Sequence, residues 1–199
     1  MIAKKNIIFK ILILIFCCLA APNVYALSDN DKKIINQISK KFSETKTMTG
    51  KFVQFNADGS KNKGIFYLKR PGLSLFSYED VPFKMLSDGN IVYTHNEQLD
   101  SWTQHDLSKT PLALITKNNV DFLNSGVEKL VYEGDYIILL STLQSFLGDS
   151  SIQLAFNKNS LQLTQWTLVD PNSNTTIMVL YDVKKNINIP QAIFTFTPK

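Results

Sequence analysis

The sequence contains few of the residues on which catalytic and metal sites are built. It has two cysteines, at positions 17 and 18, and two histidines, His95 and His105. Neither histidine has a second histidine or cysteine at metal-ligand spacing. The sequence also lacks a G-x-S-x-G motif and a glycine-rich phosphate loop. His105 and Asp106 are adjacent, and adjacent side chains on a strand point to opposite faces. The sequence therefore predicts no enzyme, no metal site and no cofactor.

An excess of one charge is also nearly absent outside the N-terminal segment. Lys4, Lys5 and Lys10 are three of the 21 Lys and Arg residues, so the rest of the chain carries 18 basic against 17 acidic side chains. A nucleic-acid-binding surface needs clustered positive charge. We therefore expect no nucleic acid partner.

Arginine occurs once, at position 70, and every other basic residue is a lysine. The planar guanidinium makes several hydrogen bonds at fixed geometry, which a lysine cannot reproduce. From its position alone, however, an exposed charge at the end of a strand is the simpler interpretation of Arg70.

The one long apolar run lies at the N-terminus and is typical of a secretory signal. Residues 7–21 follow a basic start, and residues 24–26 supply the small side chains that signal peptidase needs. We expect cleavage after Ala26, which leaves residues 27–199, 173 residues without a thiol, as one exported domain. A retained anchor is disfavoured because a spanning helix needs about 20 apolar residues. An acylated cysteine is disfavoured because Ile15 and Phe16 are not small.

Two segments predict helices. Residues 28–45 begin with a capping sequence at Ser28, and their apolar residues recur on one face while lysines occupy the other. Residues 110–115 begin with Thr110 and Pro111, a typical helix start, and are otherwise apolar. A short helix of this composition must be buried or must cover an apolar surface.

The rest of the chain alternates with a period of two and predicts ten or eleven short strands joined by close turns. Consecutive strands of this kind favour an antiparallel sheet that curls. Within it, Gly64–Tyr78 reads as a hairpin that turns at Pro71-Gly72. Alternation places Phe66, Leu68 and Arg70 on one face of the first strand, and Ser74, Phe76 and Tyr78 on one face of the second.

An ordered set of short motifs resembles the LolA family of periplasmic outer-membrane lipoprotein carriers. Each motif is weak alone, but together they run through most of the chain behind the signal and end at residues 194–196. The motifs are Phe52-x-Gln54, Gly64-x-Phe66, Lys69-Arg70-Pro71-Gly72, Phe76-x-Tyr78, Ser87-Asp88-Gly89 and Thr110-Pro111-Leu112.

The resemblance implies an α+β fold, in which an unclosed antiparallel β-barrel of about 11 strands is covered by an α-helical lid. Arg70 matches the family's arginine that hydrogen-bonds to the lid and holds it closed when the cavity is empty. Ser74 and His95 depart from the family, which usually has aromatic residues there. The residues expected to line a cavity for acyl chains are Phe52, Phe66, Leu68, Phe76, Tyr78, Leu86, Val92, Leu112, Leu114 and Ile115.

The function that the resemblance implies is that of a monomeric periplasmic chaperone without a catalytic step. It would take lipoproteins from an inner-membrane ABC transporter and pass them to an outer-membrane acceptor, if one is present, or to the membrane itself. Three alternatives remain open: a carrier of another lipid or glycolipid, an envelope-stress sensor of lipoproteins, and an exported hydrolase that uses His95 or His105. Sensors on this scaffold usually carry a second domain, for which 173 residues leave no room.

Overall fold

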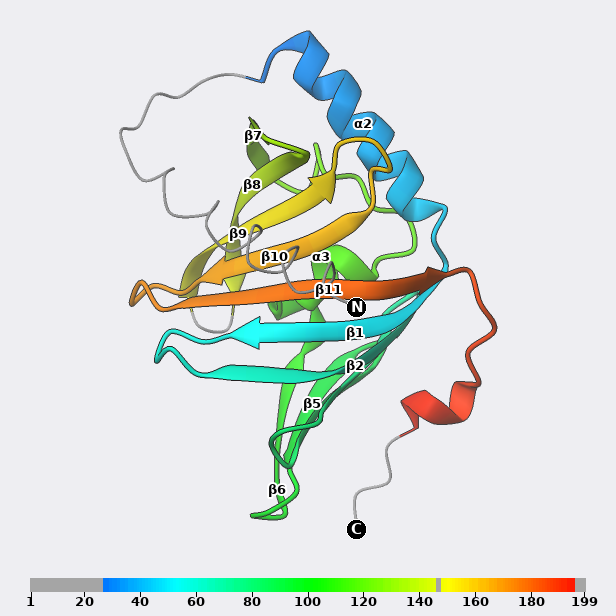
Figure 1. Cartoon of the computed structure of the whole chain (residues 1–199), viewed down its shortest axis with the longest axis vertical. Helices are drawn as coiled ribbons and strands as arrows, with labels where there is room; N and C mark the ends of the chain where they lie inside the picture. The colour runs from blue at the N-terminus through cyan, green and yellow to red at the C-terminus, as the bar shows by residue number, and fades with distance from the viewer. Residues whose placement is uncertain (1–26, 146–147, 196–199) are drawn as a thin grey trace, which may run out of the picture.

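The computed structural model describes residues 27–145 and 148–195, and its eleven strands form a single antiparallel sheet. The spatial order is β6-β5-β4-β3-β2-β1-β11-β10-β9-β8-β7, so β6 and β7 are the two edges and the sheet does not close. Figure 1 shows how strongly it curves. The predicted unclosed antiparallel barrel is confirmed. The strands are β1 Thr47–Phe55, β2 Lys61–Lys69, β3 Leu73–Tyr78, β4 Phe83–Asp88, β5 Ile91–Asn96, β6 Ser101–Asp106, β7 Val127–Glu133, β8 Tyr136–Ser145, β9 Gly148–Asn157, β10 Leu163–Val169 and β11 Thr175–Lys185.

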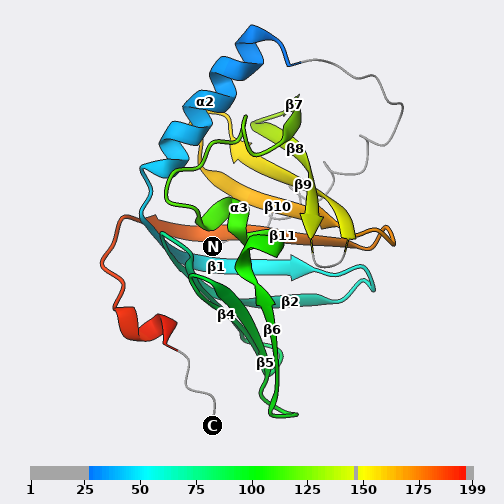
Figure 2. The ribbon, with the colours of Figure 1, turned by 180° about the vertical axis from the view of Figure 1, so that it is seen from behind.

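The two α-helices of the described residues lie on the inner side of the curved sheet (Figure 2). The long helix α2 (Asp29–Ser43) begins with a capping box between Ser28 and Asp31. The short helix α3 (Leu112–Thr116) follows a 3₁₀ turn, η2 (Leu107–Lys109), and lies in front of the curved sheet in the view of Figure 2. A second 3₁₀ turn, η3 (Gln191–Phe194), follows β11. No helix in the described part of the chain is long and apolar enough to cross a membrane.

The core fills the space between the helices and the inner face of the sheet. Ile35, Ile38 and Phe42 of α2 are buried in the same cluster as one phenylalanine from each of β1, β2 and β3, namely Phe52, Phe66 and Phe76. The predicted hairpin is present, with Phe66 of β2 directly opposite Phe76 of β3. Its turn needs a glycine at position 72, because φ is +75° and a Cβ there would lie 2.6 Å from the Cα of Gly89.

The signal predicted for residues 1–26 lies outside the described residues. The segment's cleavage therefore stays a prediction.

Ser74 is a polar residue on the face of β3 that also carries Phe76. Its side chain is fully buried, and its hydroxyl has no hydrogen-bond partner among the described residues. Ser87, the residue directly opposite on β4, is equally buried, but its hydroxyl oxygen accepts a hydrogen bond from the main-chain N–H of Gly89 at 3.3 Å. The two serines thus differ in hydrogen bonding but not in burial.

This difference predicts opposite effects of the same substitution. Ser74→Ala removes an unpaired buried hydroxyl and should raise the free energy of unfolding by about 1 kcal/mol, whereas Ser87→Ala loses a hydrogen bond and should lower it by a similar amount. Urea unfolding of the two variants beside the unmodified protein measures both changes. Destabilisation by Ser74→Ala would show that its hydroxyl is paired in solution.

Candidate functional site

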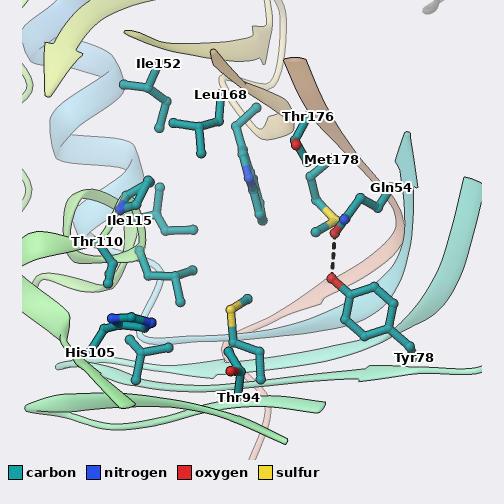
Figure 3. A pocket seen from close by; sticks show the side chains of 15 residues that line it. Gln54, Tyr78, Thr94, His105, Thr110, Ile115, Ile152, Leu168, Thr176 and Met178 are labelled. Carbon is teal, nitrogen blue, oxygen red and sulfur yellow. Dashed lines mark hydrogen bonds between the residues drawn. The ribbon is translucent and has the colours of Figure 1, made fainter. Parts of the chain in front are cut away.

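An apolar pocket of about 300 Å³ opens between α3 and the inner face of the sheet. Strands from both halves of the chain form its walls, because β1 pairs with β11 and so joins the first half of the sheet to the second. Figure 3 shows the side chains that point into it. They are Gln54, Tyr78, Met85, Val92, Thr94, His105, Thr110, Pro111, Leu112, Ile115, Ile152, Trp166, Leu168, Thr176 and Met178.

Four of the residues predicted to line a cavity line this pocket: Tyr78, Val92, Leu112 and Ile115. Three others, Phe66, Leu68 and Phe76, line a neighbouring apolar gap of only about 10 Å³. Ile115 and Trp166 border both spaces, so these two side chains separate the pocket from the gap. The predicted residues Phe52 and Leu114 are buried in the same core cluster but line neither space.

Leu86 was predicted to line the cavity and lies on the other face of the sheet. On β4, Met85 lies opposite Phe76 and points into the pocket, and alternation turns the next side chain outward. There Leu86 is buried between Leu75 and Tyr93, its partners on the flanking strands, outside the main core cluster. The prediction for Leu86 was wrong because the register of β4 places Met85, and not Leu86, on the inner face of the sheet.

Sequence analysis did not find the wall that the second half of the chain provides. Ile152, Trp166, Leu168 and Met178 belong to β9, β10 and β11 and face the pocket. The alternation in these segments indicated strands, but it did not tell which strands meet across the sheet. His105 also lies in the lining, whereas His95 stacks on Trp102 at a ring separation of 3.6 Å and lies outside it.

Arg70 joins the ends of both helices to the sheet. Its Nη1 donates to the main-chain oxygens of Phe42, at 3.0 Å, and of Thr45; Nε and Nη2 both donate to the oxygen of Ile115, at 3.2 and 2.9 Å. The guanidinium carbon also lies 4.1 Å from the centre of the Phe42 ring. The neighbouring turn adds a main-chain hydrogen bond from Gly72 N to Thr116 O, at 2.9 Å. One side chain and one turn thus fasten α2 and α3 to the β2–β3 hairpin.

The electrostatic environment of Arg70 explains why an arginine is suitable here. The side chain is only 6% exposed, and its hydrogen-bond partners are main-chain oxygens at or just beyond the C-terminal ends of helices, where partial negative charge gathers. Burial lowers the pKa of Arg70 to about 10, so the guanidinium stays charged at neutral pH. A lysine would offer a point charge without the planar fork.

The pocket also has polar groups at its edge. The Tyr78 hydroxyl donates a hydrogen bond to Gln54 Oε1 at 2.5 Å, and burial raises the pKa of Tyr78 to about 12. Among the described residues, no three His, Cys, Asp or Glu side chains gather in a way that could hold a metal ion. The lining therefore offers apolar contact and the hydrogen-bonding groups of hydroxyl, amide and imidazole side chains.

A curved, unclosed sheet around an apolar pocket is the architecture of a protein that binds an apolar ligand. Residues 43–197 match the family model described as outer membrane lipoprotein carrier protein LolA. The chain belongs to the LolA family, as the motifs predicted. Because this is a family of carrier proteins, the prediction that the chain is not an enzyme is confirmed as well.

Individual relatives agree with the family match. An outer-membrane lipoprotein carrier protein of Pseudomonas paraeruginosa is 24% identical over 182 residues, which cover 84% of this chain and 85% of that protein. Among solved structures, an uncharacterized conserved protein of Thermus thermophilus has a TM-score of 0.53 at 11% identity, covering 86% of this chain and 96% of the other. The structure of MucB has a TM-score of 0.50 at 11% identity, covering 83% of this chain and 63% of MucB. At these identities the two structures are evidence for the fold alone.

Proposed function

We propose that this protein is a periplasmic chaperone that binds the acyl chains of lipoproteins released from the inner membrane and transfers them to the outer membrane. The observation that carries the proposal is the apolar pocket beneath α3 in a chain of the LolA family. The lipoproteins would come from an inner-membrane ABC transporter. They would go to an outer-membrane acceptor where one exists.

The size of the pocket supports a carrier that must open to load. A volume of about 300 Å³ is at the lower end of the range for ligand sites, ~300–1,000 Å³. Burying one acyl chain of about sixteen carbons at ~0.8 kcal/mol per CH₂ gives roughly 12 kcal/mol, and two or three chains would bind almost irreversibly. Opening the pocket against the contacts of Arg70 offsets part of this energy. A closed empty state that competes with cargo therefore favours release.

Incubation of the purified protein, without residues 1–26, with spheroplasts tests the proposal. Lipoproteins are expected in the soluble fraction, bound to the protein, when a functional lipoprotein-releasing transporter is present. The same spheroplasts without added protein are the control. Absence of lipoproteins from the soluble fraction in the presence of the transporter would contradict a carrier function.

A carrier of another lipid or glycolipid is the second candidate. None of the fifteen described side chains that line the pocket is a lysine, arginine, aspartate or glutamate, and His105 is the single imidazole among them, so the lining has no cluster of charge that would select one headgroup. Mass spectrometry of lipid that co-purifies with the protein separates the two functions. Acylated peptide is expected for a lipoprotein carrier, and intact phospholipid or glycolipid for the alternative.

A further inference from the structure

The hydrogen-bonding groups of the pocket lie on two sides of its lining (Figure 3). Gln54 of β1, Tyr78 of β3 and Thr176 of β11 lie together at one end of the lining, as Figure 3 shows. Away from this end, Ile115 and Trp166 form an apolar boundary, behind which lies the small second gap. Thr94, His105 and Thr110 line the other side of the pocket (Figure 3), where Thr110 Oγ1 donates to Leu107 O at 2.8 Å and the Thr94 hydroxyl bonds to that of Thr103. The end with Gln54, Tyr78 and Thr176 is called the polar end below.

The polar end is held in place by its neighbours. The ring of Tyr78 packs edge-on against Phe52 and Phe83, with ring centres 5.0 and 5.3 Å away. Its hydroxyl donates to Gln54 Oε1 at 2.5 Å, and Gln54 Nε2 in turn donates to Asn56 Oδ1 at 2.6 Å. The two side chains are therefore fixed by packing on one side and by a hydrogen-bond chain on the other.

This pair can supply hydrogen-bond donors to a ligand. A tyrosine hydroxyl can rotate its proton from one acceptor to another, and the Gln54 amide has a second N–H besides the one given to Asn56. Ester carbonyl groups only accept hydrogen bonds. They are also the polar groups that directly adjoin the hydrocarbon chains of an acylated glycerol, so they would reach the polar end when the chains occupy the rest of the pocket.

We propose that Tyr78 and Gln54 form a polar subsite that hydrogen-bonds the carbonyl groups of a diacylglyceryl ligand, with the hydrocarbon chains directed toward Ile115 and Trp166. This inference rests on the proposed function and adds the orientation of the ligand to it. The subsite recognises the ester linkage and not the headgroup, since its two groups are a phenol and a carboxamide, which offer no charge to pair with one. The position of the subsite determines how deeply the hydrocarbon chains enter the pocket.

The test compares ester and ether ligands of the same shape. Trp102→Phe leaves Trp166, in the pocket wall, as the single tryptophan of the protein and so provides a fluorescence signal for binding. In this background, affinities are measured for a dipalmitoylglyceryl-cysteine peptide and for its dihexadecyl ether analogue, which lacks the carbonyl groups. Tyr78→Phe should weaken binding of the ester by about threefold to tenfold, the worth of one hydrogen bond, and leave the ether within about twofold.

A matched variant separates the subsite from general effects of losing a hydroxyl. Tyr93→Phe makes the same change on the other face of the sheet, where the hydroxyl bonds to Asp88 at 3.2 Å, and should change neither affinity. An unchanged ratio of ester to ether affinity in Tyr78→Phe would overturn the subsite while leaving the carrier function intact. Failure of both ligands to bind the unmodified pocket would instead contradict the proposed function.

A phospholipid with the same two acyl esters distinguishes the sources of the ligand. The affinity for dipalmitoylphosphatidylglycerol is measured beside that for the acylated peptide, in the Trp102→Phe protein with and without Tyr78→Phe. The subsite predicts the same relative loss for both esters in Tyr78→Phe. Loss confined to one of them would contradict recognition of the shared ester linkage.

Discussion

Replacing Arg70 by leucine is expected to open the lid, which consists of α3 and the end of α2, and to make the protein retain its cargo. The substitution removes the four side-chain hydrogen bonds by which Arg70 fastens the ends of α2 and α3 to the β2–β3 hairpin. A hydrogen bond to a charged group is worth ~1.5–3 kcal/mol. Losing several of them should shift the equilibrium between closed and open forms by about 3 kcal/mol, which is more than a hundredfold.

Two measurements test whether α3 opens more often and whether the cargo is retained. Hydrogen exchange at the main-chain N–H groups of residues 112–116 should become faster, because α3 opens more often. Transfer of a bound acylated peptide to acceptor vesicles should become at least about tenfold slower, because the empty closed form no longer competes with cargo. Arg70→Lys should lie between the unmodified protein and Arg70→Leu, since it keeps the charge and loses the planar fork.

The neighbouring residue provides the control. Lys69 ends β2 with its side chain on the other face, where Nζ donates to Gln191 Oε1 at 3.1 Å, so Lys69→Leu also removes a positive charge but leaves the lid contacts in place. Its exchange and transfer rates should match those of the unmodified protein. A normal transfer rate in Arg70→Leu would refute the role of the arginine.

Blocking the pocket with a large side chain is expected to abolish most ligand binding. Thr176 lies in the lining at the start of β11, next to the polar end. An indole at this position would occupy a large share of a pocket of about 300 Å³. Thr176→Trp should therefore lower the affinity for an acylated peptide by at least about tenfold, because each excluded CH₂ loses ~0.8 kcal/mol.

The adjacent threonine distinguishes a blocked pocket from a disturbed strand. Thr175 precedes Thr176 on β11 and points to the opposite face, since Thr176 pairs with Leu168 and Thr175 with Val169. Thr175→Trp should leave the affinity within about twofold. Calorimetric titration with the acylated and the non-acylated peptide measures both variants, and equal losses in both would mean that the pocket is not the binding site.

The local features of the fold could be predicted from the sequence because they depend on neighbouring residues. The capping sequence at Ser28 marked the start of α2, and alternation in Gly64–Tyr78 gave the hairpin and the residues that share a face with Phe66 and Phe76, while the family resemblance predicted that this face is the inner one. The helix predicted at 110–115 is shorter in the structure, where η2 precedes α3. The motifs, read in order, predicted the family and the unclosed sheet.

The pocket could be predicted only in part, because its walls come from segments far apart in the chain. Pairing of β1 with β11 brings Trp166 and Met178 into the same pocket as Tyr78, and no local pattern contains that pairing. Leu86 was placed on the wrong face because the pairing of β4 with β3 decides which side is inside. Arg70 was singled out by its rarity, but its acceptors belong to α2, the segment after it and α3, and only the structure brings these together.

The central claim is that acyl chains occupy the pocket beneath α3. An acylated peptide with a photoreactive diazirine at the end of one chain tests this most directly, because irradiation attaches the chain to the side chains that it touches. Mass spectrometry is predicted to find the adducts at residues that line the pocket or the gap behind it, such as Trp166 and Ile115, and excess unlabelled acylated peptide should suppress them. Adducts confined to the outer face of the sheet, or insensitive to the competitor, would contradict the account.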